Sequence, residues 1–150
     1  MVWGRFSSMG VGKPVFVEKN IDSLEYVNVL KENLEESTNM MNLPVYTFQQ
    51  DNASPHKSKF TRNWFQRNGI DVMSWPAQSP DLNPIENIWE KKQKVNKRSP
   101  KLIPELKGAT IEEWYNFPRD SLKKPAESFY KRASLCFEAK CGHIDYQLNF

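Results

Sequence analysis

The sequence is poor in the features that mark membrane, secreted and disulfide-rich proteins. No run of 18 or more apolar residues occurs, so we expect no membrane-spanning helix and no membrane partner. The only two cysteines, Cys136 and Cys141, are too few for a disulfide framework and fit a reducing compartment. The first fifteen residues lack the charged start, apolar middle and cleavage site of a signal peptide. These absences predict a cytoplasmic or nuclear protein.

Net charge is also small, at +3, and by itself does not indicate nucleic-acid binding. Its distribution is more informative, because the segment 91–107 carries seven basic residues against one acidic residue, Glu105. Such a segment is compatible with a phosphate backbone, although it could equally be a solvated helix face that runs into a linker. The candidate DNA-binding residues in this segment are Lys91, Lys92, Lys94, Lys97 and Arg98.

The 150 residues have room for one domain with a proper core, and no internal repeat divides them. Alternating apolar residues and turn residues predict strands, and apolar residues at three- and four-residue spacing predict helices. The resulting order of elements is typical of an α/β fold that ends in two helices. We expect strands over 2–8, 14–18, 45–49 and 70–75, and helices over 23–37 and 58–67, from Pro84, around 111–115 and from Pro125 onward.

Four of these expectations are specific enough to be tested. Residues 2–8 and 14–18 should form a hairpin, with glycines 10 and 12 and Pro14 as its turn. Asp22 should cap the helix 23–37, whose apolar face would contain Leu24, Val27, Leu30 and Leu34. A short helix around Ile111 should end at Pro118, and a longer one should begin or bend at Pro125. Trp64, Trp75 and Trp89 are expected to be core aromatics.

Two carboxylates lie where an α/β fold places ligand sites. Asp51 directly follows the predicted strand 45–49, and Glu86 lies in the first turn of the helix that Asn83 and Pro84 begin. Carboxylate oxygens suit Mg²⁺ or Mn²⁺, which take few protein ligands and leave positions open for water and phosphate. Alternatively, Asp51 could cap the turn after its strand, and Glu86 could complete a capping box with Asn83.

The sequence motifs around these carboxylates resemble those of a known family. The segments QQDNASPH (residues 49–56) and WPAQSPDLNPIENIWE (residues 75–90) closely resemble the catalytic core of mariner-superfamily transposases of the Tc-like branch. In that family, 34 residues separate an Asp in a "DN…H" motif from a Glu in "SPDLNPIEN". The same interval separates Asp51 from Glu86 here. The resemblance extends from VWGRFSS (residues 2–8) to EAKCGHIDY (residues 138–146).

The resemblance implies an RNase H-like fold of the DDE transposase and integrase type. It also implies that DNA is cut and joined at transposon ends with Mg²⁺ or Mn²⁺, and it is compatible with a homo-oligomer in the nucleus. By motif match, Asp51 would be the second metal-binding carboxylate and Glu86 the third, with Asn52 and His56 as supporting residues. His56 is expected to be a structural partner of a ligand more than a catalyst, because the metals remove the need for a strong base.

The sequence departs from the family at its first strand. The family's first catalytic Asp lies on that strand, which is central in the sheet, and no counterpart precedes the segment 2–8 here. We therefore expect an incomplete domain, inactive alone, in which a gap separates the hairpin from residues 45–49. Residues 1–98 would be the partial catalytic core, and residues 99–150 the C-terminal helical part of the same domain.

Two other functions remain open. A domesticated, non-catalytic module that binds DNA or protein could use the same scaffold and the basic segment 91–107. A general RNase H-like nuclease is a third possibility. The transposase-specific sequence motif around Glu86 argues against it. A zinc site at Cys136, Cys141 and His143 is disfavoured because no fourth ligand accompanies them.

Overall fold

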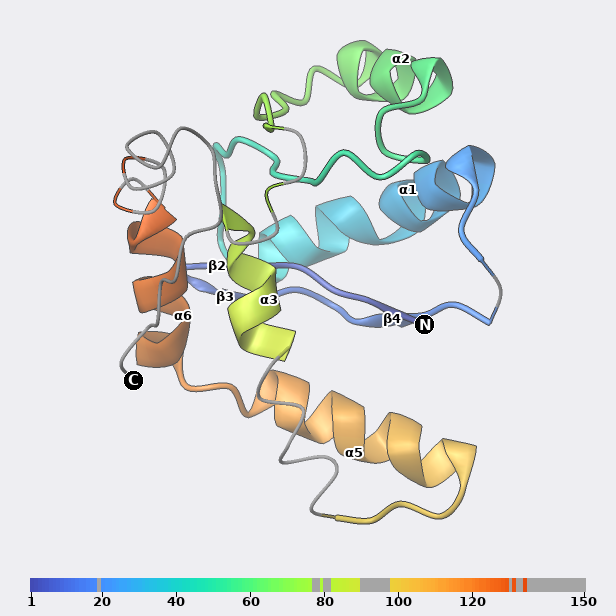
Figure 1. Cartoon of the computed structure of the whole chain (residues 1–150), viewed down its shortest axis with the longest axis vertical. Helices are drawn as coiled ribbons and strands as arrows, with labels where there is room; N and C mark the ends of the chain where they lie inside the picture. The colour runs from blue at the N-terminus through green and yellow to red at the C-terminus, as the bar shows by residue number, and fades with distance from the viewer. Residues whose placement is uncertain are drawn as a thin grey trace.

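The computed structural model describes residues 1–18, 20–76, 79, 82–89, 98–129, 131 and 134. Within these residues, short strands come first and helices follow, which confirms the predicted α/β class (Figure 1). No helix in this part of the chain is long and apolar enough to cross a membrane. The elements are β1 (Val2–Trp3), β2 (Phe6–Ser7), β3 (Gly10–Val11), β4 (Val15–Phe16), α1 (Ser23–Met40), α2 (Lys59–Arg67), α3 (Pro84–Trp89), α5 (Ile103–Tyr115) and α6 (Arg119–Glu127).

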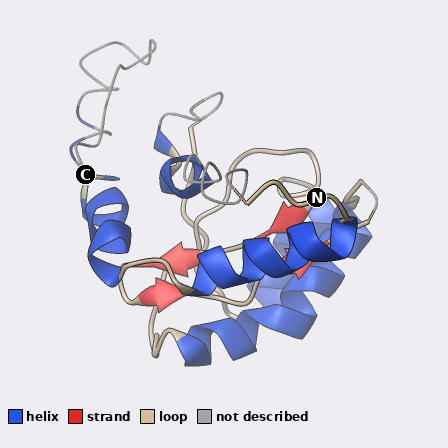
Figure 2. Cartoon of the chain, turned by 90° about the horizontal axis from the view of Figure 1, so that it is seen from below, coloured by secondary structure: helices blue, strands red, loops and turns tan. Residues whose placement is uncertain are grey.

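The predicted hairpin is present, but its turn is tighter than expected. β1 pairs antiparallel with β4, and β2 pairs antiparallel with β3, so the chain reverses at residues 8–9 (Figure 2). Gly10 therefore belongs to a strand and not to the turn, which corrects the prediction. Gly12 serves close packing instead, because a Cβ at this position would lie 2.6 Å from the Cβ of Ser37 on α1.

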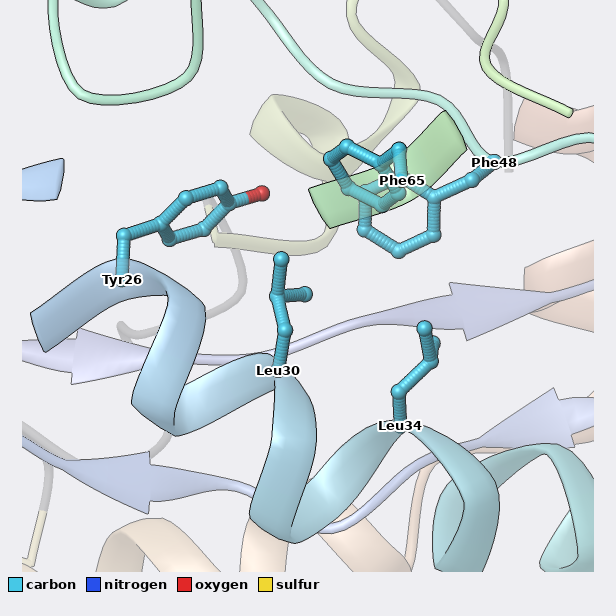
Figure 3. Packing of buried hydrophobic residues seen from close by; sticks show 5 residues of the cluster. All are labelled: Tyr26, Leu30, Leu34, Phe48 and Phe65. Atoms are coloured by element: carbon cyan, nitrogen blue, oxygen red, sulfur yellow. The ribbon is translucent and has the colours of Figure 1, made fainter. Parts of the chain in front are cut away.

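The hairpin lies between two helical layers, which its alternating side chains contact. On one face, Trp3 packs against the α1 cluster, which we define as Tyr26, Leu30, Leu34, Phe48 and Phe65. Figure 3 shows the three α1 side chains of this cluster pointing toward the two phenylalanines. On the other face, Phe6 and Val11 pack against the α3–α6 cluster, which consists of Ile88, Trp114 and Leu122. This alternation follows from the two-residue period of a strand.

Helix α1 begins as predicted, and three of the four residues predicted for its apolar face are buried. The Asp22 side chain accepts a hydrogen bond from the Glu25 N–H at 2.8 Å and so caps the helix, which continues to Met40. Val27, Leu30 and Leu34 are buried as predicted, whereas Leu24 is 57% exposed. Tyr26, which was not predicted, is buried as well, and Leu24 lies two residues, about 200°, away from it around the helix.

The predicted strands 45–49 and 70–75 are reduced to a single parallel bridge between Phe48 and Val72. The Phe48 N–H donates to the Asp71 carbonyl at 2.7 Å, and the Phe48 carbonyl accepts from the Met73 N–H at 2.8 Å. Among the described residues, no ladder joins this segment to the hairpin, whose strands pair only with each other. The gap expected between them is confirmed, and the lack of a second neighbour explains why these segments do not extend into longer strands.

The helices after the bridge partly match their predictions. Helix α2 lies within the predicted range 58–67, with Ser58 as its N-cap and Gly69 after it at a positive φ of 63°. Helix α5 has 13 residues and is not the short helix expected near Ile111. Helix α6 begins at Arg119, and Pro125 lies inside it. The prediction that a helix begins at Pro125 is therefore wrong. Leu122 and Pro125 are both buried.

Of the three tryptophans expected in the core, Trp64 and Trp89 pack against the two core clusters. Trp64 packs against the α1 cluster, Trp75 stacks on Phe129, and Trp89 stacks on Trp114 at 5.0 Å between ring centroids. The Trp114 indole also donates a 2.7 Å hydrogen bond to the Gly12 carbonyl, which ties α5 to the hairpin. The proposed boundary at residue 98 stays a prediction. The cluster Cys136, Cys141 and His143, and most of the predicted last helix, lie outside the described residues.

Candidate metal site

Asp51 is held in place through one of its two carboxylate oxygens. Its Oδ1 accepts a hydrogen bond from the Ala53 N–H at 2.9 Å and one from His56 Nδ1 at 2.6 Å. Because a carboxylate can only accept, His56 must carry its proton on Nδ1 in this contact. The alternative that Asp51 caps the turn is therefore correct for Oδ1. Among the described residues Oδ2 has no hydrogen-bond partner, so it is open to a ligand.

The support of His56 continues inward to helix α1. The Tyr26 hydroxyl donates to Gln50 Oε1 at 2.7 Å, and Gln50 Nε2 donates to the His56 carbonyl at 3.3 Å. The Tyr26 and His56 rings also lie against each other, with centroids 4.2 Å apart. We call Tyr26, Gln50, His56 and Asp51 the Asp51 network. The sequence reasoning missed Tyr26, although its four-residue spacing from Leu30 and Leu34 could have placed it on the buried face.

Burial raises the pKa of the Tyr26 phenol, and the negative charge of Asp51 raises it further, whereas Arg5 acts in the opposite direction. Tyr26 is 1% exposed. It therefore keeps its proton at neutral pH and remains the donor to Gln50. The network thus has a fixed direction of donation from the core toward the Asp51 loop.

Asn52 and Gln49 connect the Asp51 loop to the segment that leads to Glu86. The Asn52 amide donates to the carbonyls of Trp75 at 2.8 Å and Pro76 at 3.1 Å. The Gln49 amide donates to Asn83 Oδ1 at 3.2 Å, at the start of α3. Asn52 was predicted as a supporting residue, and its hydrogen bonds join the Asp51 loop to residues 75–76. Gln49 was not singled out from the sequence.

Glu86 lies in the first turn of α3, as predicted, with its side chain exposed. The helix start is formed by Asn83, whose carbonyl accepts from the Glu86 N–H at 3.2 Å. A capping box would require the Glu86 carboxylate to accept from the Asn83 N–H. No such bond exists among the described residues, so the carboxylate is not used by the cap.

Asp51 and Glu86 line the same cavity, which has a volume of about 920 Å³. Two hard carboxylates beside an open cavity fit Mg²⁺ or Mn²⁺, because these ions retain several non-protein ligands. No group of three His, Cys, Asp or Glu side chains suited to a metal ion occurs in the described part of the chain. Asp51 and Glu86 therefore fit two of the three ligands of a three-carboxylate site.

The predicted DNA-binding residues can be assessed only at Arg98. Its guanidinium pairs with Glu112 and Glu113 of α5, at 2.7 Å for the latter, so two carboxylates already neutralise it. Lys91, Lys92, Lys94 and Lys97 lie outside the described residues, and their role stays a prediction.

Comparison with known proteins assigns the family. The family model of the DDE superfamily endonucleases matches residues 5–107, which include both carboxylates. The chain belongs to this family. Its relatives are transposases of the Tc-like mariner type, as the motifs indicated. The Tc3 transposase of Caenorhabditis elegans is 34% identical over 97% of this chain, and the Tcb1 transposase of Caenorhabditis briggsae is 32% identical over 93%. These matches cover 45% and 52% of the relatives, so the chain spans about half their length.

Solved structures show the same fold for this DDE family member. The catalytic domain of Mos1 transposase, solved with raltegravir and Mn, superimposes with a TM-score of 0.83 at 15% identity. The match covers 96% of this chain and 76% of the Mos1 chain. A second structure of the Mos1 mariner catalytic domain gives a TM-score of 0.81 at 14% identity. The RNase H-like fold predicted from the motifs is thereby confirmed, in an incomplete form.

Proposed function

We propose that this chain supplies the second and third metal-binding carboxylates, Asp51 and Glu86, of a site that cuts and joins transposon-end DNA. The observation that carries the proposal is that Asp51 and Glu86 line one cavity, while Asp51 Oδ2 has no hydrogen-bond partner among the described residues. Its support comes from the family and from the Mos1 structures, which include complexes with Mn and with a transposon end.

Each residue has a defined task in this proposal. His56 and the Ala53 N–H fix the rotamer of Asp51, so that Oδ2 meets a cation without reorganisation. Asn52 and Gln49 fix the distance between the Asp51 loop and α3, which carries Glu86. A bound pair of Mg²⁺ or Mn²⁺ ions would activate the attacking oxygen and stabilise the leaving oxygen in phosphoryl transfer.

The proposal is tested by titrating Mn²⁺ into the chain and measuring its binding by calorimetry. We expect Asp51→Asn and Glu86→Gln each to weaken binding by tenfold or more, because each removes one of the few protein ligands. Glu35→Gln, an exposed carboxylate on α1, is the matched control and should leave binding unchanged. Unchanged Mn²⁺ affinity in both site variants would contradict the proposal.

A second part of the proposal is that the chain is inactive alone, because Asp51 and Glu86 are the two carboxylates among the described residues that line the cavity. The assay incubates the 150-residue chain with double-stranded transposon-end DNA and Mn²⁺ and examines the products on a denaturing gel. We expect no cleavage above the level of Asp51→Asn. Cleavage that Asp51→Asn abolishes would show that the site is complete and would overturn this part.

The domesticated binding module is the alternative function, and its evidence is the basic segment. The Arg98 ion pairs count against direct phosphate contact by this residue. Salt-dependent DNA binding that survives loss of both Asp51 and Glu86 but not of the lysines at 91, 92, 94 and 97 would favour the alternative.

We further propose a nuclear location and a homo-oligomeric complete protein, because the substrate would be chromosomal DNA and the Mos1 structures include a paired-end complex. Fluorescence imaging of the tagged protein and its mass in solution by light scattering test these two points separately. Exclusion from the nucleus would contradict the first, and a monomer on DNA would contradict the second.

A further inference from the structure

Helix α2 lies at the edge of the fold and presents a face that is rich in basic residues (Figure 1). Its inner side buries Thr61 and Phe65, and Phe65 belongs to the α1 cluster. The opposite side consists of residues at three- and four-residue spacing, which places them on one face of the helix. We call this side the outer face of α2. It comprises five exposed residues, Lys59, Arg62, Asn63, Gln66 and Arg67.

The outer face contains cations and amides but no acid. From residue 52 to residue 70 the chain has four Lys or Arg and neither Asp nor Glu. The neighbouring helix α1 has the opposite character. Its exposed charged residues are Glu25, Glu32, Glu35 and Glu36 against Lys31. Basic and acidic residues are thus separated on the surface of these two helices and not mixed.

The cations of the outer face are not neutralised within the described part of the chain. Lys59, Arg62 and Arg67 take part in none of the ion pairs between described residues, whereas Arg98 takes part in two. Lys59 also lies in the first turn of α2, where the helix dipole favours an anion over a cation. An anionic partner would therefore lower the electrostatic energy of this face.

The dimensions and chemistry of the outer face fit a phosphate backbone. From Lys59 to Arg67 the helix rises about 12 Å, and each strand of duplex DNA carries a phosphate about every 3.4 Å along its axis. The face can therefore lie along about three successive phosphates. Lys and Arg side chains and Asn and Gln amides are usual donors to phosphate oxygens. A protein partner fits less well, because interface centres use aromatic and apolar anchors, which the outer face lacks.

Helix α2 is joined firmly to the loop of the candidate metal site. The Ala53 carbonyl accepts hydrogen bonds from the N–H groups of His56 at 2.9 Å and Lys57 at 3.1 Å. At the start of the helix, Thr61 Oγ1 donates to the Pro55 carbonyl at 2.7 Å. A duplex held on α2 would thus have a fixed position relative to this loop.

We propose that the outer face of α2 binds the sugar-phosphate backbone of duplex DNA and positions the duplex beside the candidate metal site. The choice of DNA as the partner rests on the proposed function, but binding by α2 requires no metal ion. Phosphate contacts carry no sequence information, so this surface binds transposon-end and unrelated duplexes alike. It is separate from the basic segment 91–107, whose Arg98 is already paired with two carboxylates.

The test measures binding of a fluorescein-labelled duplex to the full chain by fluorescence anisotropy, with EDTA, at a series of potassium chloride concentrations. Each phosphate contact adds about 0.9 to the magnitude of the slope of log K against log salt concentration. Lys59→Gln, Arg62→Gln and Arg67→Gln should each lower this magnitude by about 0.9, and the triple variant by about 2.7. Glutamine has a helix propensity close to that of Lys and Arg, so α2 should stay folded, which circular dichroism verifies.

Two controls separate this face from general effects of charge and from the metal site. Lys31→Gln removes an exposed cation from α1 and should leave the slope unchanged. The triple variant should bind Mn²⁺ as the unaltered chain does, because it retains Asp51 and Glu86. Failure of the proposed metal site would appear instead as unchanged Mn²⁺ affinity in Asp51→Asn, so the two proposals can fail independently. The single variants give the same comparison where the triple variant does not fold.

An unchanged slope in the triple variant would overturn the proposal, as would a loss confined to one DNA sequence or the absence of duplex binding by the unaltered chain. Loss of the whole salt dependence on replacing the lysines at 91, 92, 94 and 97 would assign the DNA to the basic segment and would also overturn it. Displacement of the duplex by polyglutamate at equal concentration of charge would show that the face takes an acidic protein segment, which equally contradicts the proposal.

Discussion

Asp51 and Glu86 are supported by different helical layers, which hold them differently. Asp51 belongs to the α1 side, where its network reaches the buried Tyr26. Glu86 belongs to α3, a six-residue helix that Ile88 anchors in the opposite cluster, and the Glu86 carboxylate itself is exposed. One ligand is thus oriented by side-chain contacts before any metal arrives. The Glu86 carboxylate has no such contact among the described residues and is positioned by the backbone of α3. Substitution of the surrounding residues should therefore affect metal binding more at Asp51 than at Glu86.

The largest effect is expected when the α1 layer is disrupted. Leu30 is fully buried in the α1 cluster, so Leu30→Ala should lower the free energy of unfolding by about 2–5 kcal/mol. Urea denaturation measures the change. Leu24→Ala, at an exposed site of the same helix, should change it by less than about 0.5 kcal/mol. A loss at Leu30 no greater than at Leu24 would show that α1 does not hold this layer.

The opposite layer is disrupted by Trp114→Phe. The substitution removes the indole donor of the 2.7 Å bond and leaves the Gly12 carbonyl unpaired in the interior. We expect a loss of about 2 kcal/mol in the free energy of unfolding. Tyr115→Phe, at the adjacent and half-exposed residue, is the control and should be nearly neutral. A neutral Trp114→Phe would mean that α5 docks on the hairpin without this bond.

The substitution His56→Ala tests whether Asp51, unlike Glu86, depends on a side-chain partner for its orientation. Loss of the hydrogen bond to Asp51 should weaken Mn²⁺ binding by about tenfold, the lower limit for groups that orient a metal ligand. Lys57→Ala, at the next and exposed residue, should not change binding. An unchanged affinity in His56→Ala, with Asp51→Asn still damaging, would indicate that Asp51 needs no orienting partner.

The smallest effect concerns pH. The pKa of Tyr26 is raised in the folded protein, so its phenol stays protonated while an unfolded tyrosine ionises above about pH 10. At this residue the unfolded state then binds fewer protons, so the contribution of Tyr26 to the free energy of unfolding falls as pH rises past 10. At pH 10.5 this contribution should be lower than at pH 9 by under about 1 kcal/mol, measured as the difference between the unaltered chain and Tyr26→Phe.

Urea denaturation of the unaltered chain and of Tyr26→Phe at pH 7, 9 and 10.5 isolates this contribution. The phenylalanine variant should lack it, whereas Tyr115→Phe should retain it because Tyr115 is half-exposed. Ultraviolet titration in which all tyrosines ionise together near pH 10 would contradict the prediction.

The elements with a local signal were predictable from the sequence. Asp22 caps α1 as its position before an apolar run indicated, α2 lies within the predicted range 58–67, and Asn83 with Pro84 begins α3. The segments 45–49 and 70–75 were located correctly, but the sequence could not show that only one bridge would form. Strand length depends on a neighbour that supplies hydrogen bonds, and such a neighbour is not encoded in the strand itself.

The sequence by itself determined the family, the α/β order of elements and the identity of the two candidate carboxylates. Sequence motifs, apolar periodicity and helix caps are local properties of the chain. Only the tertiary structure decided that Asp51 uses one oxygen for its turn and keeps the other free, and that Tyr26 supports it from α1. The burial of Arg5, whose guanidinium has no hydrogen-bond partner among the described residues, likewise could not be seen in the sequence. The physical reason is that burial and hydrogen-bond partners are set by segments far apart in the chain.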